Sequence, residues 1–572
     1  MNHSKLASLL AAAGITLTLS SCGNALSGVS SFVSSSLSSS SSSSSYSSGT
    51  SSSLSSSPSS SSIDLNPIGL ETGTGAYPLK GSTNADGSLS YSIFVRSFCD
   101  SDGDGIGDFK GAESKGEYLK SLGVSRVWLL PINSSSSYHG YDVDDYFSVE
   151  SDYGTIEDFT SLLTSFHALG IDVILDLVLN HSSKNNAWFK RSYNDYIAGN
   201  TGSNSKKDWY NWSESSHDGY SSYNGLYYEA RFDSSMPDFN FDSAGVQAEF
   251  KEIMDYWLSL GVDGFRLDAV RYYYYGNTDS NVKALSTLVD DVKSDYPDVY
   301  FVGENWITET DYYAYYASKV PSFFNFSTSI SSSTSTFIQV AKGFVSGDAF
   351  SKTIANIESH VKEQNPDGFS SYFLSNHDQD RSSKSLTGYK AKLAASIYLL
   401  LPGTPYVYYG EEIGLKGTRG ANDGSDALRR LPMIWSKDDK TGECSFPEKN
   451  RLDLEDDVIQ VTEGASDLEK EPLSLTNHYK KVGDVRNEFP FIQQSTFKSV
   501  STKNSSLMAY TLEGDESKIL VVHNLSNASI EYDVSSLASS IIDSIDTSNL
   551  IPSLKDGKLG IGGYSTVILK AI

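Results

Sequence analysis

Three acidic residues, Asp268, Glu304 and Asp378, each stand at or just after the end of a predicted buried strand. The stretches that contain them read GFRLDAVR, GENW and NHDQDR, and a stretch upstream reads DLVLNH. Cleavage of a glycosidic bond needs one carboxylate at the anomeric carbon and one protonated carboxyl group at the leaving oxygen. These residue types therefore point to that chemistry, provided that the fold brings the strand ends together.

Two of these carboxyl groups have neighbours that set their charge. Arg266 lies two residues before Asp268 on one predicted strand, hence on the same face, where its guanidinium can keep the carboxylate ionised. Glu304 follows the apolar run 299–303, and apolar surroundings disfavour the ionised form of a carboxyl group. Asp268 is thereby suited to attack and Glu304 to donate a proton.

Short apolar runs alternate with longer amphipathic segments from about Tyr91 onward, which predicts βα units around a parallel sheet. The predicted strands are 92–96, 126–131, 172–178, 264–268, 299–303, 323–326, 372–375 and 406–409. This alternation predicts an α/β fold, a (β/α)8 or TIM barrel, with its chemistry at the carboxyl ends of the strands. The third and fourth strands are too far apart for one crossover helix, so residues 181–241, rich in Trp and Tyr, should form an inserted domain.

The barrel is expected to occupy residues 76–490, with its last helix over 478–487, and to be followed by a small β-sandwich domain over 491–572. Residues 1–22 are expected to be a secretory signal that ends in Leu-Ser-Ser-Cys. Residues 23–75 are mostly Ser and are expected to be a disordered linker.

Taken in order, the four stretches resemble the α-amylase superfamily, glycoside hydrolase family 13, over roughly residues 76–572. The resemblance implies that Asp268 is the nucleophile of a retaining mechanism, Glu304 the general acid/base, and Asp378 a ligand of the distorted sugar. It also implies that further residues shape the site or contact the sugar: His139, Tyr141, Asp142, Asp176, Asn180, His181, Arg266, His377 and Arg381.

Two features suggest which kind of family member this chain is. Ala269 follows the predicted nucleophile, where α-1,6-selective oligoglucosidases usually have Val, and residues 236–240 resemble a signature of an intermediate group that includes bacterial α-amylases. Both favour cleavage of α-1,4 bonds in starch-like glucans and maltooligosaccharides. An α-glucosidase, oligo-1,6-glucosidase or neopullulanase-like activity stays open, as does glucan synthesis or isomerisation. A non-catalytic glucan-binding role is disfavoured because all three acids are present.

An acidic loop follows the first predicted strand. Carboxylates at positions 1, 3, 5 and 9 and a backbone carbonyl at position 7 match the spacing of a calcium loop, and the residues are Asp100, Asp102, Asp104, Ile106 and Asp108. Position 12 is Gly111 and no helix pair flanks the loop, so an EF-hand is not predicted. The expectation is a structural Ca²⁺; the alternative is a metal-free acidic turn.

Charge and cysteine usage limit the partners. The chain has 44 Lys+Arg against 71 Asp+Glu, a net charge of -27, which argues against nucleic acid as a partner and leaves a neutral or cationic substrate.

The end of the leader resembles a bacterial lipobox, which implies that Cys22 is lipidated. The protein would then be a monomeric, cell-surface lipoprotein that meets the membrane only through its anchor; ordinary signal cleavage is the alternative. Cys99 and Cys444 are expected to be buried thiols, although a disulfide between them stays open.

Overall fold

The computed structural model describes residues 89–307, 309–329, 336–419, 426–446, 460–547 and 551–572. The predicted leader, Cys22, the Ser-rich linker and the start of the predicted barrel segment lie outside these residues. Within the described residues, no helix is both long enough and apolar enough to cross a membrane.

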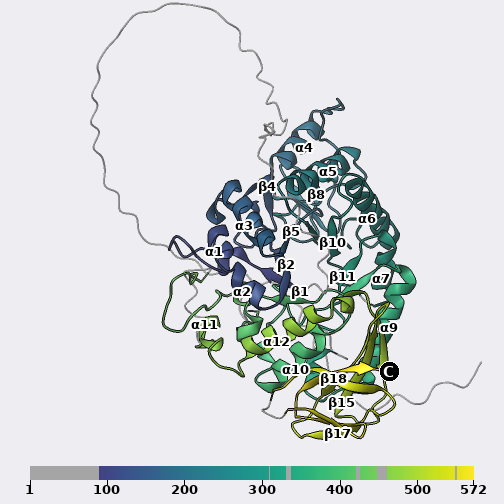
Figure 1. Cartoon of the computed structure of the whole chain (residues 1–572). Helices are drawn as coiled ribbons and strands as arrows, with labels where there is room; N and C mark the ends of the chain where they lie inside the picture. Colours follow the sequence, from purple (N-terminus) through teal and green to yellow (C-terminus); the bar gives the residue numbers. More distant parts are fainter. Residues whose placement is uncertain (1–88, 308, 330–335, 420–425, 447–459, 548–550) are drawn as a thin grey trace, which may run out of the picture. The chain divides into compact units, whose positions relative to one another are not determined.

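The described residues form a parallel barrel. Its strands, in chain order, are β1 (Leu89–Ile93), β2 (Val124–Leu129), β5 (Asp172–Leu177), β9 (Gly264–Leu267), β10 (Tyr300–Gly303), β11 (Ser322–Phe324), β12 (Phe369–Ser371) and β13 (Tyr406–Tyr408), drawn in Figure 1. From β1 to β12 each strand pairs with the next, and β13 pairs with β1. The circle closes just past β12, where Phe373 bridges Tyr406 and the Tyr406 N–H donates to the Tyr372 carbonyl at 2.8 Å. The predicted TIM barrel is confirmed.

Amphipathic helices cover the barrel because their apolar positions recur at helical spacing. In α3 (Ile156–Ala168) the buried residues are Phe159, Leu162, Leu163 and Phe166, and Thr155 caps the first turn together with Asp158. The other long helices are α5 (Ala244–Ser259), α6 (Thr278–Lys293), α9 (Gly347–Gln364), α10 (Tyr389–Leu399) and α12 (Leu475–Glu488). Shorter ones are α1 (Phe109–Glu113), α2 (Gly116–Ser121), α7 (Glu309–Ala314), α8 (Phe337–Ala341) and α11 (Ala465–Leu468). Helix α12 contains the predicted last barrel helix.

Two predicted strands were displaced along the chain. The sequence predicts the first at 92–96, but Val95–Ser97 forms a 3-10 turn and the strand ends at Ile93. It predicts the seventh on the apolar run 372–375, but the paired strand is Phe369–Ser371. Ser371 can be buried because its hydroxyl lies 2.6 Å from that of Ser322 on the neighbouring strand. Hydrophobicity alone was therefore a poor guide to these strand bounds.

A small aromatic-rich subdomain lies between β5 and α5. It contains α4 (Ala187–Ile197) and an antiparallel sheet of β6 (Trp212–Ser213), β8 (Leu226–Glu229) and β7 (Tyr220–Tyr223). A single bridge between His181 and Asp238 joins the subdomain's two ends, and a bridge between Tyr210 and Phe239 ties its middle to its C-terminal end. A second excursion, the hairpin β3 (Asn133–Ser135) and β4 (Val143–Val149), follows β2 and carries the loop that contains Tyr141.

The C-terminal segment is all β. One sheet has the order β14 (Thr496–Val500), β15 (Leu507–Glu513), β16 (Lys518–Asn524), β21 (Thr566–Ala571) and β18 (Ala538–Ile545). The other consists of β17 (Ile530–Asp533), β20 (Lys558–Ile561) and β19 (Ser553–Lys555). Apolar residues from both sheets, among them Leu520, Leu559 and Leu569, form a shared core. The C-terminal all-β domain that the sequence predicts is therefore present.

Candidate active site

One buried arginine connects the strand ends. The Arg266 side chain on β9 is 1% exposed, and its Nη1 donates to Asp176 Oδ1 on β5 at 2.7 Å and to Asp268 Oδ1 at 2.5 Å. Its Nη2 lies 3.3 Å from Glu304 Oε1, directly after β10. A buried charge is tolerated when it is paired and hydrogen-bonded, and here the pairing fixes three carboxyl groups around one guanidinium.

Glu304 is held so that its neutral form is favoured. Burial raises the pKa of Glu304 to about 8, with the charges of Asp268 and Asp378 adding to the effect and Arg266 opposing it. The backbone N–H of Ala269 donates to Glu304 Oε2 at 3.0 Å. Ala269 adopts a left-handed conformation with φ of 48° at the turn that follows Asp268. A protonated carboxyl group at neutral pH can serve as a proton donor.

Asp378 has the opposite environment. Burial opposes its ionisation, but His377 and Arg430 outweigh burial and hold the pKa of Asp378 well below its ordinary value. Arg430 Nη2 donates to Asp378 Oδ1 at 2.9 Å, and His377 Nε2 lies 3.0 Å from Oδ2. The Tyr141 hydroxyl lies 2.6 Å from the same His377 nitrogen and donates to Asp176 at 2.8 Å. Asp378 is therefore a fixed anion linked through Tyr141 to the Arg266 cluster.

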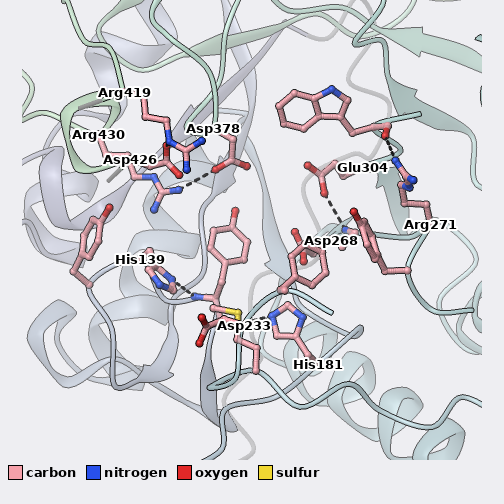
Figure 2. A pocket seen from close by; sticks show the side chains of 17 residues that line it. His139, His181, Asp233, Asp268, Arg271, Glu304, Asp378, Arg419, Asp426 and Arg430 are labelled. Atoms are coloured by element: carbon pink, nitrogen blue, oxygen red, sulfur yellow. Dashed lines mark hydrogen bonds and ion pairs between the residues drawn. The ribbon is translucent and has the colours of Figure 1, made fainter. Parts of the chain in front are cut away.

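These groups border a pocket of about 800 Å³. Figure 2 shows Asp378 and Arg430 on one side of it and Glu304 and Arg271 across from them. Two rings of its lining stay partly open to solvent: Trp306 is 40% exposed and stacks on Phe326, and Phe232 is 45% exposed. Open aromatic faces beside hydrogen-bonding groups suit the mixed apolar and hydroxylated faces of a sugar.

Comparisons with known proteins agree with this geometry. Residues 92–495 match the family model "Alpha amylase, catalytic domain", and residues 507–568 match "Alpha-amylase SusG C-terminal domain". The chain belongs to the α-amylase family. It is 38% identical to "Alpha-amylase 3" of Dictyoglomus thermophilum, over 84% of this chain and 93% of that protein. It is 30% identical to a 4-alpha-glucanotransferase of Thermotoga neapolitana, over 78% of this chain and 97% of that one.

Solved structures of the same family are similar throughout the described part. Eubacterium rectale Amy13B aligns with a TM-score of 0.79 at 36% identity, covering 85% of this chain and 96% of that one. An alpha-amylase from H. orenii aligns with a TM-score of 0.74 at 32% identity, covering 85% and 99%. The chain is thus a glycoside hydrolase of the α-amylase family, with a TIM barrel and a C-terminal β domain.

Most of the predicted site residues of this family member come together. His139, Tyr141, His181, Asp268, Glu304 and Asp378 line the pocket. Asp176, Arg266 and His377 lie behind these groups as their hydrogen-bond partners, and Asn180 donates to Asp238 at 3.1 Å. Burial, together with Arg430, lowers the pKa of His139 to about 4, and burial also lowers the pKa of His181. Both rings are therefore neutral hydrogen-bonding groups near neutral pH.

Two predicted sugar contacts do not reach the pocket. Asp142 is not part of the lining, and its Oδ1 accepts hydrogen bonds from the Ser135 and Ser137 hydroxyls. Arg381 is buried and donates to the carbonyls of Tyr409 at 2.6 Å and Arg429 at 3.1 Å. Both side chains turn toward backbone or loop groups that need a partner, so they stabilise the walls of the site.

Sequence reasoning missed Arg430, one of the arginines that line the pocket. Arg430 follows a 3-10 turn, Ala427–Arg429, far along the chain from the acids. Besides Asp378 it binds the His377 carbonyl at 3.2 Å, while Arg429 binds the Asp378 carbonyl at 2.7 Å. The only sequence signal is the Arg429-Arg430 pair itself, which no neighbouring motif marks.

The acidic loop lies apart from the pocket lining. Carboxylate oxygens of Asp100, Asp102 and Asp108 lie within 4.8 Å of one another, whereas Asp104 is not part of this cluster. Backbone bonds join Asp100 to Gly442 at 3.1 Å and Ser445 to Gly105 at 2.7 Å. The cysteines of these two segments, Cys99 and Cys444, are buried and free, as expected.

Substitution of Arg430 and substitution of Arg381 should have different effects on the enzyme. Arg430→Lys keeps a charge but loses the planar fork that binds Asp378, so kcat/KM on maltotriose should fall about 10- to 100-fold with little change in Tm. Arg381→Lys should lower Tm and leave kcat/KM of the folded enzyme within about threefold of wild type. Equal losses of kcat/KM in both folded variants would mean that Arg381 takes part in the site after all.

Proposed function

We propose that this enzyme hydrolyses α-1,4-glucosidic bonds of starch-like glucans and maltooligosaccharides with retention of anomeric configuration. The observation that supports it most is that one guanidinium contacts both the Asp268 and the Glu304 carboxyl groups beside the pocket. Retaining enzymes need their two carboxyl groups about 5 Å apart, and contacts to a single guanidinium favour such a short separation. The similarity to "Alpha-amylase 3" supports the substrate class.

In the first step, a carboxylate oxygen of Asp268 attacks the anomeric carbon and the bond from that carbon to the leaving oxygen breaks. Glu304 gives its proton to that oxygen, for which its raised pKa suits it. Arg266 donates a hydrogen bond to Asp268 Oδ1 and so orients the carboxylate toward the sugar. Asp378, a fixed anion, accepts hydrogen bonds from hydroxyls of the distorted ring, and Tyr141 packs beneath it.

In the second step, water attacks the anomeric carbon and the ester bond to Asp268 breaks. Glu304 takes the proton from the water. Formation of the ester removes the charge of Asp268, which is one of the causes that raise the pKa of Glu304. The pKa of Glu304 therefore falls in the intermediate, and the same group becomes a better base when a base is required.

The products formed from starch decide between this proposal and its alternative. The enzyme should release mixed maltooligosaccharides from soluble starch and act on maltotriose far faster than on isomaltose. Asp268→Asn, nearly isosteric, is the matched inactive control, and it should fold with an unchanged Tm. Glucose as the sole early product, or a preference for isomaltose, would contradict the proposal and favour an α-glucosidase or oligo-1,6-glucosidase.

The pH dependence of kcat/KM should reflect the ionisation of Glu304. Since its protonated form is the active one, kcat/KM should fall as pH rises through about 8, the raised pKa of Glu304. Glu304→Gln should lose about 10²- to 10⁴-fold on maltotriose. It should lose much less on an aryl maltoside whose acidic phenol leaves without proton donation. Equal losses on both substrates would argue against Glu304 as the acid.

We also propose that the loop cluster of Asp100, Asp102 and Asp108 binds a structural Ca²⁺. All of its candidate ligands are oxygens, which Ca²⁺ prefers, and the three carboxylates bring them within 4.8 Å of one another. Chelation should lower Tm without affecting the residues that do the chemistry. Asp102→Ala should abolish that response and lower the metal content, whereas Asp298→Ala, an exposed turn carboxylate, should not. Unchanged metal content in Asp102→Ala would refute the site.

A last proposal concerns location. Lipidation of Cys22 followed by the Ser-rich segment would hold the monomeric enzyme at the cell surface, where starch fragments arrive. Cys22→Ser should move the enzyme from the membrane fraction to the soluble fraction. An unchanged distribution would argue for another anchor or for ordinary secretion.

A further inference from the structure

A second cavity of about 710 Å³ lies in the subdomain between β5 and α5. It shares no lining residue with the active-site pocket. Its walls come from the end of α4, the loop that leads to β6, and β7. The cavity is therefore a separate feature of nearly the same size as the pocket at the acids.

Three partly exposed aromatic rings line this cavity: Tyr196, Trp212 and Tyr220. The Trp212 ring is supported from behind by Phe189, at 5.1 Å between centroids and 26° between planes. Its Nε1–H donates to the Ser192 hydroxyl at 2.9 Å. Tyr196 lies beside it with a centroid distance of 6.1 Å. The Trp212 and Tyr196 rings are thus held in place by their neighbours.

The polar wall of the cavity is also built in advance. Asn200 Nδ2 and the Lys206 N–H donate to the two oxygens of the Asp195 carboxylate, each at 2.9 Å. The Ser205 hydroxyl donates to the Asn200 carbonyl at 2.9 Å. These bonds fix the loop that brings hydroxyl and amide groups next to the rings. A wall ordered by its own contacts loses little entropy when a ligand binds.

The chemistry of the lining selects a neutral ligand. Its charged side chains, Lys207 and Asp208, are of opposite sign, and its other polar side chains are amides and hydroxyls. Aromatic faces next to amides and hydroxyls match a polyhydroxylated ring, which has an apolar face and a polar edge. Anionic ligands are disfavoured by the net charge of -27.

We propose that this cavity is a second, non-catalytic binding site for the α-glucan chain that the active site cleaves. The proposal rests on the proposed function for the identity of the glucan. Binding of one chain at two places raises the effective concentration of its remaining bonds near the acids. Long glucans therefore gain affinity from the cavity, whereas maltotriose, held by the active site alone, gains none.

Calorimetry with maltoheptaose and the full-chain Asp268→Asn variant tests the proposal. Two binding events per chain are expected, and one should disappear when Tyr196→Ala and Tyr220→Ala are added. Tyr227→Ala, on β8 but outside the cavity, is the matched control and should keep both events. Tyr196→Phe retains the ring and should also keep both. A single event in Asp268→Asn, or two events in the double alanine variant, would overturn the proposal.

Kinetics in the active chain separate this site from the catalytic one. The Tyr196→Ala/Tyr220→Ala variant should show a KM for soluble starch raised about tenfold, with kcat/KM on maltotriose unchanged. If the double variant does not fold, Tyr196→Ala alone serves, because this residue lies at the end of α4. Equal KM values for starch would refute the second site while leaving the function intact. Failure of wild type to hydrolyse maltotriose would instead refute the proposed function.

Discussion

The guanidinium of Arg266 is the constraint on which the site depends. It is buried, so its charge must be compensated by carboxyl groups that come from three neighbouring strand ends. That requirement ties the chemistry to the register of the barrel: Asp176 pairs directly with Arg266 between β5 and β9, and Gly303, just before Glu304, pairs with Leu267, just before Asp268. A slip of one residue in either pair would turn a carboxyl group away and leave a buried charge without its partner.

Two acids of the pocket have opposite ionisation properties. Removal from water disfavours ionisation of both Glu304 and Asp378. Glu304 stays largely neutral because burial raises its pKa more than Arg266 lowers it, and the charges of Asp268 and Asp378 raise it further. Asp378 is ionised because Arg430 and His377 bind its two oxygens directly. The division between proton donor and fixed anion therefore follows from the charged groups that contact each acid.

The sequence predicts the features that depend on strand periodicity and on the order of the strands. It does not predict the features that depend on where a side chain points in the folded structure. Arg266 and Asp268 were placed together because residues two apart share a strand face. Asp142 and Arg381 belong to the right loops, yet each turns toward hydroxyl or carbonyl groups that only the folded structure brings near. Arg430 was missed because it reaches Asp378 from a separate segment without a motif. The displaced seventh strand has a similar cause, since a long-range pair of hydroxyls, Ser322 and Ser371, makes a polar strand tolerable.

Ala269 directly follows the nucleophile, Asp268, and its backbone N–H contacts the general acid, Glu304. Its left-handed backbone, which costs a non-glycine residue about 1 kcal/mol or more, is offset by the bond from its N–H to the Glu304 side chain. The next N–H, that of Val270, donates to the Glu304 carbonyl at 3.2 Å. The turn that leaves the Asp268 strand thus fixes the acid through both backbone and side chain. A β-branched residue at position 269 would narrow the space beside Asp268 and strain this turn at the same time. Any effect of a substitution at position 269 on linkage preference would therefore have two causes. One is the change in the space available to the sugar, and the other is the change in the orientation of the proton donor, Glu304.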